Sequence, residues 1–546
     1  MNFNSLHFIA FFAIVVAGFW LLRRRVMARN VFLLLASWYF YDRVTGDIRW
    51  LLLLLGTQAF DYTFARLMER YPLGSRQRKW CVVGSCTVNL AVLGFFKYCN
   101  FFIDNVIIAG EYAGYHWSRP ALNIALPAGI SFYTFQSISY VIDVYRGHLK
   151  AEKHIVHYAL FVAFFPQLIA GPIERATHLL PQVKSKLEPK WDDICQGVWL
   201  IWLGLFKKVV LADNVETIAN SVLLYHRDVT PTWWEATLGI YAFAIQIYCD
   251  FSAYSDMARG AARILGIDLM RNFDLPYFAV NPSDFWRRWH ISLSTWLRDY
   301  LYIPLGGNRG GLLVRPTRFV QSKFEQFKQT VRRLLRIRPK PVVEPLSPAP
   351  VGVLNYERAP LPEKKEGPEL GVSLSNYLNL FLTMLIGGLW HGATWLFIMW
   401  GIYHGLLLCI HRAFQPLLKK FFTFESRPVL AVWTFVRIVI FFQFTCFGWL
   451  LFRADNMDNF KRMLSAFFAY TAPDKPIEMM SRNSVVALVV IAVVLLVGQL
   501  VKYFKDDHGV VFRVPMPVRA VLYAGMILAF LIYGKYDGGS FIYFQF

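Results

Sequence analysis

Charged residues are scarce in this chain of 546 residues, because Asp, Glu, Lys and Arg together make up only 17% of it. A soluble globular protein carries about 25% charged residues. Here 56% of the residues are hydrophobic and the mean hydropathy is +0.38. The composition therefore argues against a soluble domain and is typical of a protein that lies in a membrane.

Cysteine is also rare, with seven residues that form no CxxC pair and lie mostly in apolar segments. Such cysteines usually behave as small core residues, so we expect neither a disulfide framework nor a metal site. Acidic residues number 36 against 57 basic ones, and the formal net charge is +21. In a membrane protein this excess follows from the positive-inside rule and from contact with anionic lipid, so we expect lipid contact and no nucleic-acid partner.

Apolar segments of about 20 residues, the length that crosses a bilayer, recur along the whole chain. The clear ones lie near residues 6–22, 47–66, 81–103, 195–211, 236–249, 392–410, 430–452, 484–501 and 517–533. Less regular ones lie near residues 30–41, 121–142, 155–170, 285–304 and 376–390. No strand alternation is evident, and we expect an all-α polytopic membrane protein with roughly 11 to 14 transmembrane or re-entrant helices.

One segment, residues 312–372, interrupts this pattern with nine Lys and Arg residues between 315 and 340 and a Pro-rich stretch after them. A charged Arg or Lys at mid-bilayer costs about 2.5–3.5 kcal/mol, so the segment belongs outside the membrane, and the positive-inside rule places it in the cytoplasm. The segment divides the chain into N-terminal membrane helices in 1–311, the insert itself, C-terminal membrane helices in 373–533 and a tail, 534–546.

This placement also sets the direction of the predicted helices. Segment 376–390 would leave the cytoplasm, each later segment would reverse direction, and the tail would lie outside. At the other end of the chain, Arg23, Arg24 and Arg25 follow the first apolar segment, and no basic region precedes it. That order predicts an uncleaved first helix with its N-terminus outside.

The most conspicuous polar residue in an apolar segment is His391, in the sequence GGLWHGATW (387–395). Polar groups inside a membrane are costly, which makes each one a candidate for function. A neutral histidine can take a proton from a hydroxyl and later return it, and glycines let a ligand approach closely. The alternative is a core histidine bonded to a neighbouring carbonyl.

A second motif, DFWRRWHISLSTWLRDY (284–300), places Arg287, His290, Ser294 and Arg298 at spacings of 3, 4 and 4. These spacings predict a single helix face, on which arginines would bind the phosphates of an acyl carrier. The alternative is an interfacial helix whose arginines reach lipid headgroups. The loop after it lacks the GK[ST] ending of a Walker motif.

Two aspartates, Asp250 and Asp256, lie in the apolar sequence QIYCDFSAYSD (246–256). Buried carboxylates need partners, and Arg259 and Arg263 follow at compatible helical spacing. We interpret this motif as a structural polar network rather than a catalytic one.

The last six residues, FIYFQF (541–546), are unusually apolar for a free tail. We expect them to insert into a groove of the same protein. A simple packing role is one interpretation, and the other is that the Tyr543 hydroxyl approaches the active site.

Taken together, these motifs resemble the membrane-bound O-acyltransferase family and, within it, the membrane subunits of alginate O-acetyltransferases. The further matching stretches are LPAGISFYTFQ (126–136) and FPQLIAGPI (165–173), and the resemblance covers nearly the whole chain. It implies helices around a central funnel with a narrow channel to the cytoplasm. The insert at 312–372 departs from the alginate-type subunits, so the polymer would be alginate- or cellulose-like.

The resemblance implies that His391 is the catalytic histidine and His290 the second active-site histidine. The donor would be cytoplasmic acetyl-CoA, with no bound cofactor, and Arg287, Arg298 and Ser294 would bind it. Tyr543 resembles the tyrosine of a small membrane peptide of the teichoic-acid system and would carry acetyl to a periplasmic SGNH-type acetyltransferase.

The expected activity is therefore O-acetylation of an exported polysaccharide from the bacterial inner membrane, together with the machinery of polysaccharide synthesis and export. A family member that acylates a lipid or a protein is the first alternative. A transporter is the second, although no inverted repeat supports it.

Overall fold

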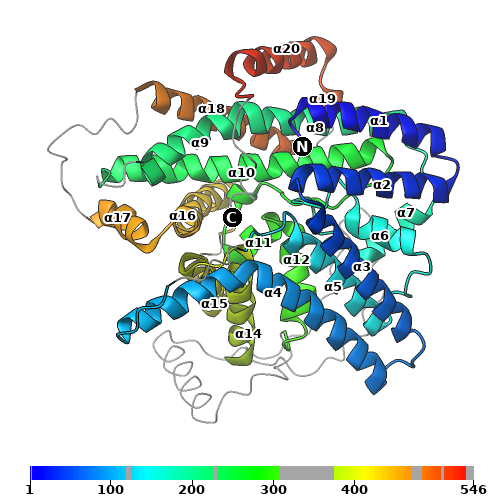
Figure 1. The fold of residues 1–546 in the computed structure, drawn as a ribbon. Coiled ribbons are helices and arrows are strands. Elements are labelled where there is room, and N and C mark those ends of the chain that lie inside the picture. Colours follow the sequence, from blue (N-terminus) through cyan, green and yellow to red (C-terminus); the bar gives the residue numbers. More distant parts are fainter. Residues whose placement is uncertain are drawn as a thin grey trace.

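The computed structural model describes residues 1, 3–118, 124–225, 230–307, 374–422, 424–468, 482–505, 510–536 and 541. Every regular element in this part of the chain is helical (Figure 1), which confirms the predicted all-α class. In chain order the helices are α1 (Leu6–Leu22), α2 (Val26–Thr45), α3 (Ile48–Met68), α4 (Arg76–Tyr112), α5 (Ile130–Arg146), α6 (Ile155–Ala163), α7 (Ala176–Lys184), α8 (Trp191–Phe206), η1 (Lys207–Ala212), α9 (Asp213–Asn220), η2 (Ser221–Tyr225), α10 (Trp233–Ile264), η3 (Pro276–Phe278), α11 (Pro282–Arg288), α12 (Ile291–Leu297), η4 (Arg298–Tyr302), α14 (Leu374–His391), α15 (Trp395–Phe421), α16 (Arg427–Arg453), α17 (Met457–Phe468), α18 (Arg482–Lys505), α19 (Val510–Arg513) and α20 (Met516–Tyr533).

Six helical segments in the described part of the chain are long and apolar enough to cross a membrane. They span residues 76–112, 191–224, 395–418, 427–453, 483–501 and 516–533. In the last two, only 11% and 6% of the most apolar window is buried in the protein. Such outward-facing apolar surface is stable next to lipid, so the chain is a multi-pass membrane protein. The predicted insert, 312–372, lies outside the described residues.

Two segments predicted as single helices are broken. The first, 155–170, is helical only in α6, after which residues 164–175 run through the interior as a buried irregular stretch. Irregular backbone at membrane depth requires polar partners from the protein. Here Ser37 Oγ accepts a hydrogen bond from Phe165 N at 3.1 Å, and Ser292 Oγ accepts one from Ile173 N at 3.0 Å. The second broken segment, 285–304, contains His290.

The hydrophobic core has two parts. One is built mainly from α1 to α7 with α12, and the other from η1, α9, α10, α11, α16 and α17. The short helices α11 and α12 lie in the middle of the molecule between these parts (Figure 1). Trp289 belongs to the second part, whereas Leu293 belongs to the first. His290 therefore lies at the boundary between the two cores.

Candidate functional site

His391 is the last residue of α14 and lies at a sharp turn between two closely packed helices. A side chain at Gly401 of α15 would put its Cβ 2.7 Å from the Met384 carbonyl oxygen of α14. The absence of that side chain allows the two backbones to touch, as in small-residue contacts between membrane helices. Thr394 then begins α15 by accepting a hydrogen bond from Phe397 N at 3.4 Å. The sequence thus ends one helix at His391 and starts the next at Trp395, with Thr394 as the capping residue.

Aromatic rings surround the His391 side chain, which is only 8% exposed. The Trp400 ring of α15 lies 4.9 Å away at 79°, and the Phe452 ring of α16 lies 5.3 Å away at 74°. The preceding Trp390 ring lies at 4.9 Å on another side. Three helices thus build a buried, aromatic environment around one imidazole.

His290 lies at a break in the predicted helix, so the prediction of one continuous helix face for Arg287, His290, Ser294 and Arg298 is wrong. Helix α11 ends at Arg288, and His290 has a φ of 42° before α12 begins. The break is caused by hydrogen bonds to a segment outside the motif, which helical spacing does not show. Ile291 N donates to Asn272 O at 2.9 Å, and Asp274 N donates to Arg288 O at 2.9 Å.

Left-handed backbone of this kind is uncommon for a residue other than glycine and costs on the order of 1–3 kcal/mol. It persists only where the surroundings hold it. The neighbouring Ser292 hydroxyl donates to Asn272 Oδ1 at 2.6 Å, which fixes the start of α12. The strained turn directs the His290 side chain into the interior, where it is 0% exposed.

The two histidines come together around Trp390. The His290 ring lies 6.0 Å from the Trp390 ring, which is in turn 4.9 Å from His391. Phe251 of α10 packs against His290 at 4.7 Å and completes this side of the site. Residues that are about 100 positions apart in the sequence therefore share one buried cluster, as two residues of one active site must.

A third histidine, His404 of α15, was missed by sequence reasoning. It is 2% exposed, and its ring lies 4.6 Å from Trp400, which also contacts His391. On its other side the Trp286 ring lies at 5.2 Å. The signal was present, because His404 is a polar residue in an apolar span. We call His290, Trp390, His391, Trp400 and His404 the histidine–tryptophan cluster.

The predicted donor-binding residues lie at different places. Arg287, with 73% of its side chain exposed, is 3.5 Å from Asp284, and the Ser294 hydroxyl donates to Trp289 O at 3.0 Å. Arg298 begins η4 and binds Asp299 at 2.7 Å. The break at His290 thus separates Arg287 from Ser294 and Arg298.

Two further arginines, also missed, lie beside Arg298. The Arg175 and Arg146 guanidinium groups lie 4.7 and 5.5 Å from the centre of the Tyr300 ring. Arg175 is 3.8 Å from Asp299, the partner of Arg298. We call Arg146, Arg175 and Arg298 the arginine cluster.

The two predicted network aspartates form buried ion pairs with lysines rather than mainly with the expected arginines. Lys208 of η1 binds both Asp250 at 2.7 Å and Asp213 at 2.9 Å, and all three side chains are at most 3% exposed. Lys207 binds Asp256 at 2.7 Å. We call these five residues the ionic network.

The expected arginines, Arg259 and Arg263, contribute little to the ionic network. Arg259 reaches Asp256 only at 3.9 Å, and Arg263 binds Asp193 and Asp268 instead. The lysines come from a different helix, so spacing within one motif did not reveal them.

The start of the apolar tail is buried against the ionic network. Phe541 is 2% exposed, with its ring 5.1 Å from Tyr254 and beneath the Lys208 ammonium at 4.7 Å. The predicted insertion of the tail is therefore confirmed at Phe541. Tyr543 lies outside the described residues.

Comparison with known proteins identifies the family of the chain. Residues 148–315, which include His290, match the model of the MBOAT, membrane-bound O-acyltransferase family. The chain is 36% identical over 477 residues to the probable alginate O-acetylase AlgI of Pseudomonas aeruginosa, covering 86% of this chain and 75% of that protein. The chain belongs to the membrane-bound O-acyltransferase family.

Two other relatives of this O-acyltransferase have different names. The peptidoglycan O-acetyltransferase of Helicobacter pylori is 32% identical over 492 residues, covering 85% of this chain and 79% of that protein. The teichoic acid D-alanyltransferase of Bacillus subtilis is 27% identical over 339 residues, covering 61% of this chain and 70% of that protein. Membership makes the chain an O-acyltransferase rather than the transporter considered above.

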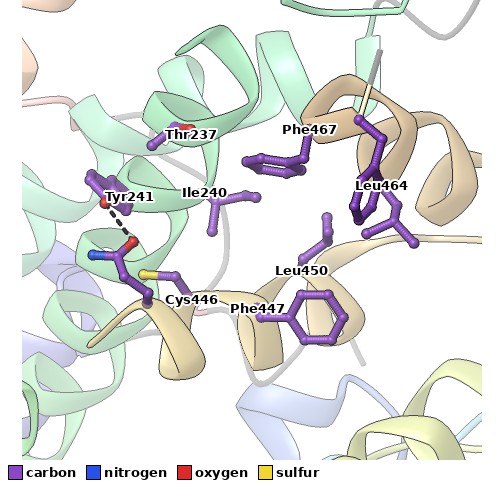
Figure 2. Close-up of a pocket in the computed structure, with 10 residues that line it drawn as sticks. Thr237, Ile240, Tyr241, Cys446, Phe447, Leu450, Leu464 and Phe467 are labelled. Carbon is purple, nitrogen blue, oxygen red and sulfur yellow. Dashed lines mark hydrogen bonds between the residues drawn. The ribbon is translucent and has the colours of Figure 1, made fainter. Parts of the chain in front are cut away.

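An apolar groove of about 260 Å³ lies elsewhere on the O-acyltransferase, between α10, α16 and α17 (Figure 2). Its lining residues are Thr237, Ile240, Tyr241, Gln443, Cys446, Phe447, Leu450, Leu464, Phe467 and Phe468. At one end Tyr241 Oη donates to Gln443 Oε1 at 2.7 Å. The lining includes no histidine and no charged residue, so the groove is separate from the histidine–tryptophan cluster.

Proposed function

We propose that this O-acyltransferase takes acetyl from cytoplasmic acetyl-CoA and passes it across the bacterial inner membrane for O-acetylation of an exported polysaccharide. The observation that carries the proposal is the meeting of His290 and His391 at the boundary between the two cores. Relatives named for acetylation of alginate and of peptidoglycan support a polysaccharide acceptor.

His391 is proposed as the general base. A thioester is already activated, so the protein must chiefly position the reactants and move one proton. The acceptor hydroxyl oxygen would attack the acetyl carbonyl carbon while His391 takes the hydroxyl proton. The carbon–sulfur bond then breaks, the thiolate receives that proton from His391, and the products are an acetyl ester and coenzyme A.

His290 is proposed to orient the reacting groups or to stabilise the oxyanion that forms during attack. The proposal is supported by its 0% exposure and by the left-handed turn that holds it near Trp390. Strained residues with fixed surroundings often mark sites where a side chain must be held in place before the reaction.

The arginine cluster is proposed to bind the donor phosphates, since guanidinium groups bind phosphate in a bidentate manner. Arg298 and Ser294 keep their predicted roles, Arg146 and Arg175 join them, and Arg287 remains a candidate on α11. Helix η4, which begins at Arg298, leads to Gly307, whose amide donates to the Tyr302 carbonyl oxygen of that helix at 2.9 Å. Gly307 is the last described residue before the predicted cytoplasmic insert, which supports donor entry from that side.

A continuous row of rings connects the arginine cluster with the proposed base. It consists of Tyr300, Trp296, Phe135 and Trp390, with successive centroid distances of 5.4, 3.9 and 5.4 Å. The next ring, 4.9 Å beyond Trp390, is His391. We propose that the donor's acyl arm lies along this row, so that the phosphates stay at the arginines while the thioester reaches the histidines.

Tyr543 is proposed as the first acetyl acceptor, from which a periplasmic SGNH-type partner would pass acetyl to the polysaccharide. The buried position of Phe541, two residues earlier, supports this. Phe541 contacts Tyr254, one helical turn from Phe251, which packs against His290. A lipid or protein acceptor would use the same base and donor but would not need the tail.

The experiment is mass spectrometry of the purified full chain after incubation with isotopically labelled acetyl-CoA, beside His391→Ala and Tyr543→Phe. We expect label on the peptide that carries Tyr543 in the wild type and in neither variant. Coenzyme A release with no label on the chain would remove the relay and leave the acyltransferase. Equal release by His391→Ala would remove the proposed base.

A further inference from the structure

The end of α14 is bound by a neighbouring helix, α4, at the turn that carries His391. The last carbonyl groups of any α-helix have no partner within the helix. Tyr98 Oη donates to the Leu389 carbonyl oxygen at 2.7 Å. Lys97 Nζ donates to the Trp390 carbonyl oxygen and, at 3.3 Å, to that of His391. Two adjacent residues of α4 thus bind three successive carbonyls of α14.

Lys97 is an unusual residue for its position. It is the one charged residue between Trp80 and Ile103, in a helix apolar enough to cross the membrane. A charge there is costly and is retained where it has a specific partner. The carbonyl end of a helix carries partial negative charge, so an ammonium group is favourable at that end. Its Nζ also lies 5.6 Å from the centre of the Trp390 ring.

The same face of α4 also holds the start of α15. Phe101, one turn after Lys97, packs against Trp395 at 5.8 Å. Asn105, one turn further, accepts a hydrogen bond from Trp395 Nε1 at 2.9 Å. One face of α4 therefore binds both sides of the tight turn between α14 and α15.

From these contacts we infer that Lys97 and Tyr98 are positioning residues for His391. By binding the carbonyls of residues 389–391, they fix the last turn of α14 and with it the direction of the imidazole. The inference rests on the proposed role of His391 as the base. A displacement of about 1 Å in a reacting group can cost on the order of 10²-fold in rate, so a loss of these bonds should be seen in the chemical step.

The test is the rate of coenzyme A release from acetyl-CoA by the purified full chain, with kcat and KM measured separately. Lys97→Met keeps an unbranched side chain that is one atom shorter but removes its donors, and should lower kcat by roughly 10²-fold with little change in KM. Lys97→Arg keeps charge and donors and should restore most of the rate. Tyr98→Phe removes one neutral hydrogen bond and should lower kcat by about three- to tenfold.

Matched controls on the same helix are Lys79→Met and Tyr112→Phe, because both side chains are exposed. Both should keep the wild-type kcat. Thermal unfolding in detergent shows how much of each variant is folded, so that rates refer to folded protein. Tyr98→Phe keeps the lysine and provides a second test if Lys97→Met folds poorly.

Wild-type kcat in folded Lys97→Met and Tyr98→Phe, with His391→Ala inactive, would overturn the positioning role alone. A Lys97→Arg variant as slow as Lys97→Met would also overturn it, since both donors and charge are then present. Full activity in His391→Ala would overturn the proposed function and this inference together.

Discussion

The histidine–tryptophan cluster and the ionic network both bury polar side chains in the core, but their neighbours differ. Around His391 the described neighbours are mainly aromatic rings, at 4.9 to 5.3 Å. In the ionic network, Lys208 lies within 2.9 Å of two carboxylates. Phe251 connects the two regions, because it follows Asp250 in α10 and packs against His290.

We interpret this difference as one between the proposed base and groups that stabilise the fold. A base must be able to gain and lose a proton, and a close packing of rings can orient an imidazole while excluding water. Buried ion pairs, by contrast, become strongly destabilising when one partner is removed. We therefore expect substitutions in the first region to reduce activity and substitutions in the second to reduce stability.

The largest effect should follow from His391→Ala. Loss of a general base typically lowers a rate by 10²–10⁴-fold, and coenzyme A release should fall by about that factor. Because the ring contacts are shared by several side chains, the variant should remain folded. Thermal unfolding in detergent checks this point, and an inactive variant that is also unfolded would not support a catalytic role.

For Lys208→Met we expect a loss of stability, in contrast to the loss of activity expected for His391→Ala. It leaves Asp213 and Asp250 buried without their shared cation, which should cost about 3–5 kcal/mol of stability. The measurement is reversible unfolding in detergent. Lys461→Met is the control, because its pair with Asp458 is exposed, at 69% and 94% of the two side chains. Equal stability of the two variants would contradict the assignment of the ionic network to the fold.

A smaller effect, on substrate binding, is expected at the arginine cluster. Arg298→Gln removes a charged donor and should raise KM for acetyl-CoA by about 10- to 100-fold, since a hydrogen bond to a charged group is worth about 1.5–3 kcal/mol. Arg43→Gln is a matched control. Arg43 has the same side-chain exposure of 59% as Arg298 and likewise lies next to its aspartate partner. Equal KM values would exclude Arg298 from donor binding.

The smallest effect is expected at His178, which forms an ion pair with Glu174. Burial lowers the pKa of His178, but the Glu174 carboxylate, 2.8 Å away, more than compensates, and the pKa is raised overall. A raised folded-state pKa adds stability below the unfolded value, about 6.5. That stability is lost as pH rises through the folded pKa. The melting temperature difference between wild type and His178→Gln should therefore shrink from pH 6 to pH 8, and a constant difference would contradict the pairing.

The sequence was most informative where a candidate residue differs clearly from its neighbours along the chain. His391 could be predicted as a candidate because a histidine between glycines in an apolar segment is conspicuous. His404 carried the same signal in α15, and the same reasoning could have found it. The all-α class likewise follows from the repeated apolar segments.

Features that depend on distant segments could not be predicted. The turn at His290 is set by Asn272 and Asp274, whose backbone bonds to residues 288–291 override the helical spacing. The lysine partners of Asp250 and Asp256 come from η1. Lys97, which donates to carbonyls at the end of α14, comes from α4. Periodicity within one motif contains no information about any of these contacts.

The most direct test of the account is the sidedness of the reaction in sealed proteoliposomes of known orientation. Acetyl-CoA would be supplied on one side only, and coenzyme A release would be followed with a membrane-impermeant thiol reagent, with His391→Ala as the blank. Release is expected only when the donor is on the side predicted to carry residues 312–372. Equal release from both sides, or release only from the opposite side, would contradict donor entry from the side of the predicted cytoplasmic insert, which the proposed transfer across the membrane requires.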